Sequence, residues 1–147
     1  MMPILVRLLL FIHVFSVTLA IGPFFVLLPL TQRLRSSDPQ EQAIYLDVFR
    51  LAIRWAKHAG HLLILTGILL WVTGPWPWTT PWIDVTSVIL IGSLVFLARA
   101  FSPTLRKLKD SPEDAKVLVG KLRRSIWIYI VLLMAMLAFM VTKPPLW

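Results

Sequence analysis

The chain has 147 residues, of which 58% are hydrophobic, with no cysteine and a formal net charge of +8. The lack of cysteine excludes disulfides, thiolate metal sites, iron–sulfur clusters and covalently attached c-type haem. The hydrophobic content is above that of an ordinary soluble domain. Because it is concentrated in long uncharged runs, we expect an integral membrane protein.

The first uncharged run extends from Leu8 to Leu30. About 20 helical residues cross a bilayer core, so this run spans the membrane by itself. Arg7 before an apolar stretch is also found in signal peptides, but the run is too long for one. We therefore predict a retained transmembrane helix over residues 4–30, with His13 inside its uncharged part.

Three shorter apolar runs predict further transmembrane helices over residues 50–74, 81–102 and 124–142. Between the first two helices and between the last two lie polar segments, 31–49 and 103–123, which we expect to be loops. The predicted fold is all-α, a single domain over residues 1–147. It is a polytopic four-helix up-down bundle made of two helical hairpins.

The basic residues set the expected orientation. Five of the 15 Lys and Arg lie between Arg33 and Lys57 and eight between Arg99 and Arg124, leaving only Arg7 and Lys143 elsewhere. This is the positive-inside pattern, so we expect both polar loops in the cytoplasm and both termini outside. The charge then serves orientation and contact with anionic lipid, and no nucleic-acid partner is expected.

Helix starts can be read from proline and acidic residues. The stretches DPQE (38–41) and SPED (111–114) each combine a cap residue, a proline and an acid, which is typical of a capped helix start. They predict that helices two and four begin in the cytosol and project beyond the bilayer. Thr80 before Pro81 predicts the start of helix three, with Asp84 in its first turn.

Small residues indicate helix contacts on the first and second predicted helices. Gly60, Gly67 and Gly74 recur every seven residues, a spacing that permits close helix approach on one face. Ser16 and Ala20 share a face with His13 and leave room for a helix or a flat ligand. The connection GPWPWTTPW (74–82) predicts an aromatic belt at the surface, formed with Trp71.

A stripe of ionisable residues follows helix two. At 100° per residue, Arg54, His58 and His61 fall within about 60° of one another, with Arg50 behind them. Ionisable residues at membrane depth usually face the bundle interior and are candidates for function. The alternative is that the arginines reach lipid phosphates while His58 lies at the interface. We expect His61, one turn deeper, to face inward.

His13 and His61 are the predicted cofactor ligands. With 1.5 Å per residue, their depths below the outer surface are ~14 and ~15 Å for one choice of helix ends, and ~8 and ~20 Å for another. Two imidazoles from facing helices are typical ligands of b-type haem iron. Arg54, with Arg50, would neutralise the propionates, and His58 would lie beside them at the cytosolic edge.

Other chemistries remain open or are disfavoured. His58 and His61 with Met136 and Met140 could instead hold Cu(I). A haem-free accessory subunit, in which the histidines only make interhelical hydrogen bonds, is a further alternative. There is no carboxylate pair at membrane depth, phosphate-binding glycine loop or Ser–His–Asp pattern, so a hydrolase or ATP-driven pump is not expected.

Four stretches resemble one family of small membrane proteins. They are HVFSVTLAIGPFF (13–25), the basic start of helix two ending in LTGILLW (65–71), LARAFSPTLRK (97–107) and the LRRSIW…MVTKPPLW ending. Together they resemble the four-helix superfamily of CopD copper-resistance proteins and HemJ-type protoporphyrinogen oxidases. The resemblance is greatest to an uncharacterised bacterial branch.

The resemblance implies a location, a ligand and two activities. The location is the bacterial inner (cytoplasmic) membrane, and His13 matches the helix-one histidine that HemJ-type enzymes use for haem. FVLLPLTQRL (25–34) lacks the arginine that those enzymes have directly after the proline. We therefore expect a b-type haem protein in electron transfer or a membrane redox complex, with an oxidase as the alternative. Redox subunits or further copies of the chain are the expected partners.

Overall fold

The computed structural model describes residues 3–77, 79–110 and 115–143. These residues form four helices and no strand: α1 (Ile4–Ser36), α2 (Pro39–Thr73), α3 (Pro81–Asp110) and α4 (Ala115–Thr142). Each helix is long and apolar enough to cross a membrane. The predicted all-α fold with four membrane-spanning helices is confirmed at this level.

The helices are longer than the apolar runs alone predicted. α1 ends at Ser36, α3 ends at Asp110, and α2 begins at Pro39. The expected loops 31–49 and 103–123 are therefore wrong, since most of their described residues are helical. The reason is packing: these segments bury leucine and phenylalanine side chains between the helices, namely Leu34, Leu46, Phe49, Leu105, Leu108, Leu118 and Leu122.

The side chains of Asp38 and Gln42 stabilise the turn between α1 and α2 by hydrogen bonds to its backbone. The Asp38 carboxylate accepts from the Glu41 backbone N–H at 2.9 Å, which confirms the predicted cap. Gln42 is buried and its Nε2 donates to the carbonyl oxygens of Leu34 and Ser37 at 3.3 and 3.4 Å. The otherwise unpaired carbonyls at the end of α1 thus find a donor.

The other two predicted starts have different outcomes. Helix α3 begins at Pro81 as predicted, and Thr80 is at its N-cap position, where its carbonyl oxygen accepts the Asp84 N–H at 3.2 Å. The Thr80 hydroxyl donates to the Pro77 carbonyl oxygen at 2.6 Å, so the side chain adds no capping bond. The SPED stretch (111–114) and Trp78 lie outside the described residues.

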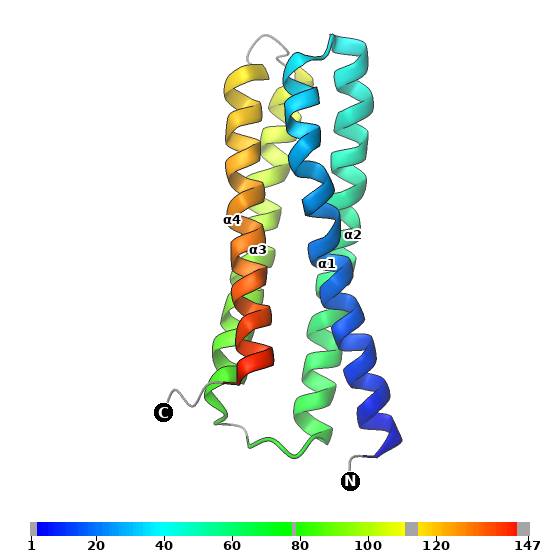
Figure 1. Cartoon of the computed structure of the whole chain (residues 1–147), viewed down its shortest axis with the longest axis vertical. Helices are drawn as coiled ribbons and strands as arrows, with labels where there is room; N and C mark the ends of the chain where they lie inside the picture. Colours follow the sequence, from blue (N-terminus) through cyan, green and yellow to red (C-terminus); the bar gives the residue numbers. More distant parts are fainter. Residues whose placement is uncertain (1–2, 78, 111–114, 144–147) are drawn as a thin grey trace.

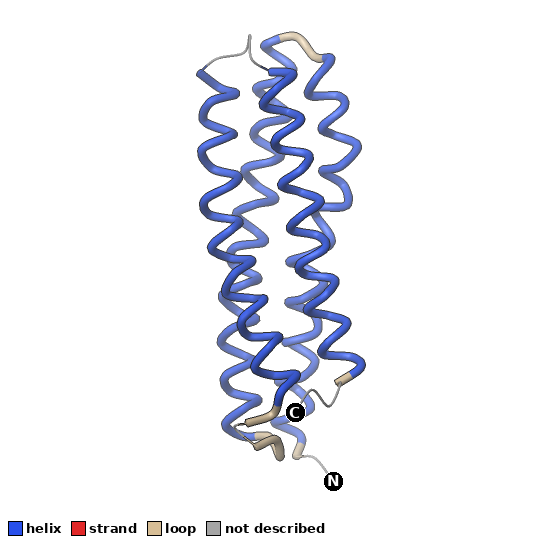
Figure 2. The backbone as a smooth tube through the Cα atoms, turned by 90° about the vertical axis from the view of Figure 1, so that its left-hand side faces the viewer, coloured by secondary structure: helices blue, strands red, loops and turns tan. Residues whose placement is uncertain are grey.

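The helices are arranged in two pairs (Figures 1 and 2). Contacts are most extensive between α1 and α2 and between α3 and α4, and less extensive between α1 and α4 and between α2 and α3. We call the end with Ile4, the Gly74–Thr80 connection and Thr142 the terminal end. The opposite end, with the Ser37–Asp38 turn and Asp110, is the basic end.

Three aromatic rings from three helices form the centre of the core. Phe24 lies against Tyr129, with 4.3 Å between ring centroids, and edge-on to Phe101 at 5.6 Å. All three side chains are almost completely buried. This close packing lies nearer to the basic end of α1 than to its start, and it holds the two helix pairs together there.

Buried hydroxyl groups are bonded within their own helices. Ser16, Ser93, Thr104 and Ser125 each donate to the carbonyl oxygen four residues earlier. This arrangement satisfies polar atoms that hydrocarbon could not. It also leaves these groups without a role in joining the helices.

Two glycines of α2, Gly60 and Gly67, and Gly74 just after its end have three different neighbours. A Cβ added at Gly60 would lie 2.5 Å from Leu94 Cδ2 of α3, and one at Gly67 would lie 3.4 Å from His13 Cε1 of α1. Gly74 is next to the ring of Trp76. The seven-residue spacing therefore does not mark one seam between two backbones, although two of the glycines do permit close contacts between helices.

Candidate functional site

The terminal end contains a partly open cavity of about 600 Å³ to which all four helices contribute. This volume lies within the range of about 300–1,000 Å³ typical of small-molecule and cofactor sites. Aliphatic and aromatic side chains make up most of the wall. A few polar groups interrupt it, namely His13, Thr86, Ser87 and Lys143.

His13 is half-buried on the α1 side of the cavity and is tied to α2. Its Nδ1 lies 2.9 Å from Thr66 Oγ1. The single Thr66 hydroxyl hydrogen has a partner of its own, because Oγ1 lies 2.8 Å from the Leu62 carbonyl oxygen. When the hydroxyl donates to that carbonyl, only its lone pairs remain for His13, so Nδ1 is the protonated nitrogen.

This bond determines what His13 can do. With the proton on Nδ1, the Nε2 atom keeps its lone pair and can bind a metal ion or accept a hydrogen bond. Histidine ligands of metals usually donate their other N–H to an oxygen, which fixes both the tautomer and the ring orientation. Thr66 provides that acceptor here. The lack of a side chain at Gly67 leaves room for the imidazole beside α2.

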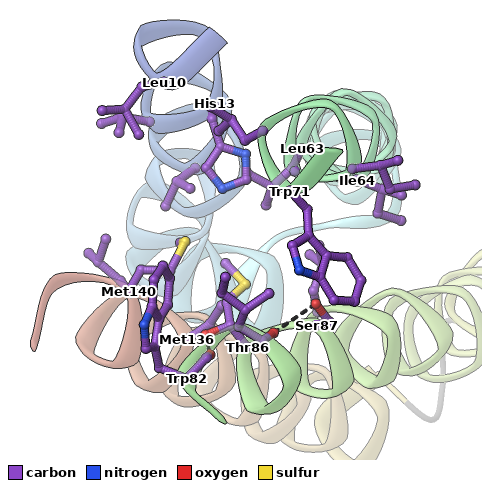
Figure 3. Close-up of a pocket in the computed structure, with 18 of the residues that line it drawn as sticks. Leu10, His13, Leu63, Ile64, Trp71, Trp82, Thr86, Ser87, Met136 and Met140 are labelled. Atoms are coloured by element: carbon purple, nitrogen blue, oxygen red, sulfur yellow. Dashed lines mark hydrogen bonds between the residues drawn. The ribbon is translucent and has the colours of Figure 1, made fainter. Parts of the chain in front are cut away.

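Two thioether side chains lie across the cavity from His13. Met136 is fully buried and Met140 is half-buried, and both come from α4 (Figure 3). Thioether sulfur is a known axial ligand of haem iron and a soft ligand for Cu(I). The cavity therefore combines one imidazole with two thioethers.

A cation and two indole rings lie together on the cavity wall at the terminal end. The Lys143 ammonium is 5.8 Å from the centre of the Trp76 ring and 5.4 Å from that of Trp82. The two rings meet edge to face with centroids 6.1 Å apart. This arrangement places a positive charge where an anionic group of a ligand could meet it.

The structure does not bring His61 to His13. His61 is exposed on the outer face of α2, as are His58 and Arg54, so the prediction that His61 faces inward is wrong. The physical reason is the rotation of α2. Leu63 and Thr66 face the bundle, and His61 lies about 200° around the helix from Leu63.

The predicted propionate partners are also elsewhere. Arg54 points away from the bundle, and Arg50 lies 3.9 Å from Asp47 on its own helix. Neither lines the cavity. The predicted copper set is likewise divided, because Met136 and Met140 line the cavity while His58 and His61 do not. Within the described ranges, no group of three or more His, Cys, Asp or Glu side chains could hold a metal ion.

Several residues of the cavity were missed at the level of sequence. Thr66, Lys143 and the pairing of His13 with Met136 and Met140 depend on which helix faces meet. The available signal was the register: His13 lies beside Thr66 and Gly67, which is between the registers given by the two choices of helix ends.

Comparisons with known proteins find no matching family model, no matching curated protein and no matching solved structure. The resemblance to the CopD and HemJ superfamily therefore stays a prediction.

Proposed function

We propose that the chain is a multi-pass protein of the bacterial cytoplasmic membrane, a four-helix up-down bundle with its terminal end outside and its basic end in the cytoplasm. Most Lys and Arg lie toward the basic end, which supports this orientation. Exposed Trp55 and Trp127 lie next to, or one turn from, Arg54 and Arg124, as expected for aromatic side chains at the inner interface.

The proposed function is binding of b-type haem in the cavity at the terminal end, for electron transfer or as part of a membrane redox complex. The observation that carries it is the hydrogen bond from His13 to Thr66, which leaves Nε2 of a cavity-lining imidazole ready to bind iron. The apolar wall suits the porphyrin ring. Haem supplies one-electron chemistry when bound.

The second iron ligand in this proposal is a thioether of α4. Met136 and Met140 are the metal-binding side chains that face His13 across the cavity, and they take the place that His61 had in the prediction from sequence. Lys143 replaces Arg54 and Arg50 as the cation for a propionate. A methionine ligand raises the reduction potential relative to a second histidine.

The test is the absorption spectrum of the protein purified in detergent. The wild-type chain is expected to show a Soret band and a positive pyridine haemochrome assay, and His13→Ala is expected to lose both. His58→Ala and His61→Ala are matched controls, because those imidazoles are exposed and lie off the cavity. A wild-type protein without haem, or loss of haem in the His61 variant alone, would contradict the proposal.

Cu(I) is a second candidate ligand of the same cavity. The observation that favours it is that both thioethers share the cavity with His13, which gives one nitrogen and two soft sulfur ligands. Metal analysis after purification with Cu(I) under reducing conditions separates the two candidates. Stoichiometric copper that His13→Ala removes, with no haem in either protein, would favour copper.

A further inference from the structure

The outer face of α2 carries a line of cationic and imidazole side chains that the cavity does not use. Arg54, Lys57, His58 and His61 are all exposed. At 100° per residue they fall within about 100° of one another. We call this set the α2 stripe. Arg50, next along the helix, already has Asp47 as a partner and is left out.

The α2 stripe changes in chemistry along the helix axis. Arg54 and Lys57 come first from the basic end, His58 lies beside them, and His61 follows ~4.5 Å further along. Exposed Leu65 and Ile68 continue the same face, with 56% and 53% of their surfaces accessible. The order is therefore full charges, then imidazoles, then hydrocarbon.

His61 is in an unfavourable place for a lipid-facing side chain. It lies seven residues, about 10 Å, from Arg54 toward the terminal end, beside exposed Leu62 and Leu65. Within the described chain neither His58 nor His61 has a hydrogen-bond partner, whereas His13 has one. A polar group at that depth is costly unless a partner satisfies it.

We propose that the α2 stripe is a binding site for one anionic phospholipid of the cytoplasmic leaflet. Arg54 and Lys57 bind the phosphate, His58 lies beside it, and His61 donates a hydrogen bond to an ester carbonyl oxygen. The acyl chains lie along Leu65 and Ile68. The order of groups in a phospholipid, phosphate then ester then hydrocarbon, matches the order of side chains along the stripe.

Charge decides between this occupant and a second copy of the chain. A symmetric pair of copies joined at this face would bring Arg54 and Lys57 close to the same cations of its partner, which is unfavourable. An anionic lipid has the complementary charge and is present in the cytoplasmic leaflet. The proposal rests on the orientation proposed above and is independent of haem binding.

The experiment compares lipids on the intact chain. Protein in mild detergent is mixed with phosphatidylglycerol, phosphatidylcholine or inorganic phosphate, and bound lipid is counted by native mass spectrometry. We expect one phosphatidylglycerol per chain that survives mild activation, with no such retention of phosphatidylcholine. Arg54→Ala/Lys57→Ala is expected to weaken retention roughly thirtyfold, about five- to sixfold for each cation.

Matched variants separate a specific site from general charge attraction. Arg33→Ala/Arg35→Ala removes the same charge from exposed positions of α1 and is expected to retain the lipid. His61→Leu should lower retention, and His61→Gln, which keeps an N–H donor, should restore part of it. The absorption spectrum of His13→Ala tests haem binding separately. Failure of the haem proposal therefore does not decide the lipid proposal, and the reverse also holds.

Several outcomes would overturn the lipid site. If Arg54→Ala/Lys57→Ala retains phosphatidylglycerol as well as wild type does, the α2 stripe does not bind the lipid. If wild type retains phosphatidylcholine as well as phosphatidylglycerol, the stripe does not select anionic lipid. Retention of inorganic phosphate as strong as that of phosphatidylglycerol would show a simple anion effect. Efficient disulfide linkage of His61→Cys chains in membranes would show that a second copy covers the stripe.

Discussion

At the residue scale, the decisive feature is that the three histidines have different surroundings. His13 is tied to Thr66 and lines a cavity, whereas His58 and His61 are exposed on α2. The same side chain is therefore a candidate ligand at one position and a candidate lipid contact at the other two. Two predictions test the surroundings of His13.

Thr66→Val should weaken haem binding without removing it. Valine keeps the shape of threonine but removes the acceptor that holds Nδ1–H of His13, so the ring loses its fixed tautomer and orientation. We expect affinity for added haem to fall roughly 10- to 100-fold in a titration of the apoprotein. Thr73→Val, at an exposed hydroxyl that donates only to its own helix, is the control and should titrate like wild type.

Substituting the thioethers should change the spin state of the iron. Met136→Leu and Met140→Leu conserve volume, so the cavity should persist while one of the two changes removes the second ligand. We expect that variant to show a high-spin spectrum and a lower reduction potential. Met134→Leu, at an exposed methionine, is the control. A low-spin spectrum in the Met136→Leu/Met140→Leu double variant would exclude thioether ligation.

At the element scale, the rotation of each helix about its axis determines what its side chains meet. α2 packs against α3 where the Leu94 side chain lies on Gly60. It packs against α1 where His13 lies on Gly67 and is hydrogen-bonded to Thr66. These contacts turn the α2 stripe outward. A change at Gly60 should therefore affect the seam between α2 and α3, while an open glycine should not.

Gly60→Leu should destabilise the chain, because a whole leucine side chain must displace Leu94, whose Cδ2 lies 2.5 Å from the position of an added Cβ. Overpacking of this kind costs about 1–3 kcal/mol. Gly92→Ala is the matched control on α3, where nothing lies within 4 Å, and it should stabilise by about 0.5–1 kcal/mol through helix propensity. Thermal unfolding in detergent measures both. Gly60→Leu/Leu94→Ala should recover part of the loss, and an unchanged midpoint in Gly60→Leu would contradict the contact.

At the scale of the whole molecule, the two ends differ in packing and in charge. The closely packed aromatic core lies near the middle of the bundle and most of the cations lie toward the basic end, while the terminal end holds the cavity between the helix pairs. The lighter contacts between the pairs, α1 with α4 and α2 with α3, leave space for a ligand where the aromatic core ends. The proposed orientation places that ligand site in the outer half of the membrane.

Single cysteines can test this orientation directly, because the chain has none of its own. Ser37→Cys lies in the turn at the basic end, and Thr79→Cys lies in the connection at the terminal end. In intact spheroplasts, a membrane-impermeant maleimide should label the Thr79 variant and not the Ser37 variant. Both should be labelled after permeabilisation, and the reverse pattern in intact cells would reject the orientation.

Much of the fold followed from the order of residues alone. The apolar runs predicted four membrane-spanning helices, because transfer of a helix into hydrocarbon depends on the composition of the run and little on its neighbours. Asp38 and Pro39 predicted the start of α2 because a helix cap is made by residues adjacent in the chain. His13 was identified as a candidate because an imidazole in an uncharged run is rare and costly.

The tertiary structure decided the partners of these residues. Whether His61 faces His13 depends on the rotation of α2, and that rotation is set by side chains of α1 and α3 that fit against Thr66, Gly67 and Gly60. The helical segments beyond the apolar runs depend likewise on leucines from different helices packing together. Residues far apart in the chain make these contacts, so a local sequence pattern cannot predict them. The cavity with His13, Met136 and Met140 forms only when the four helices pack together.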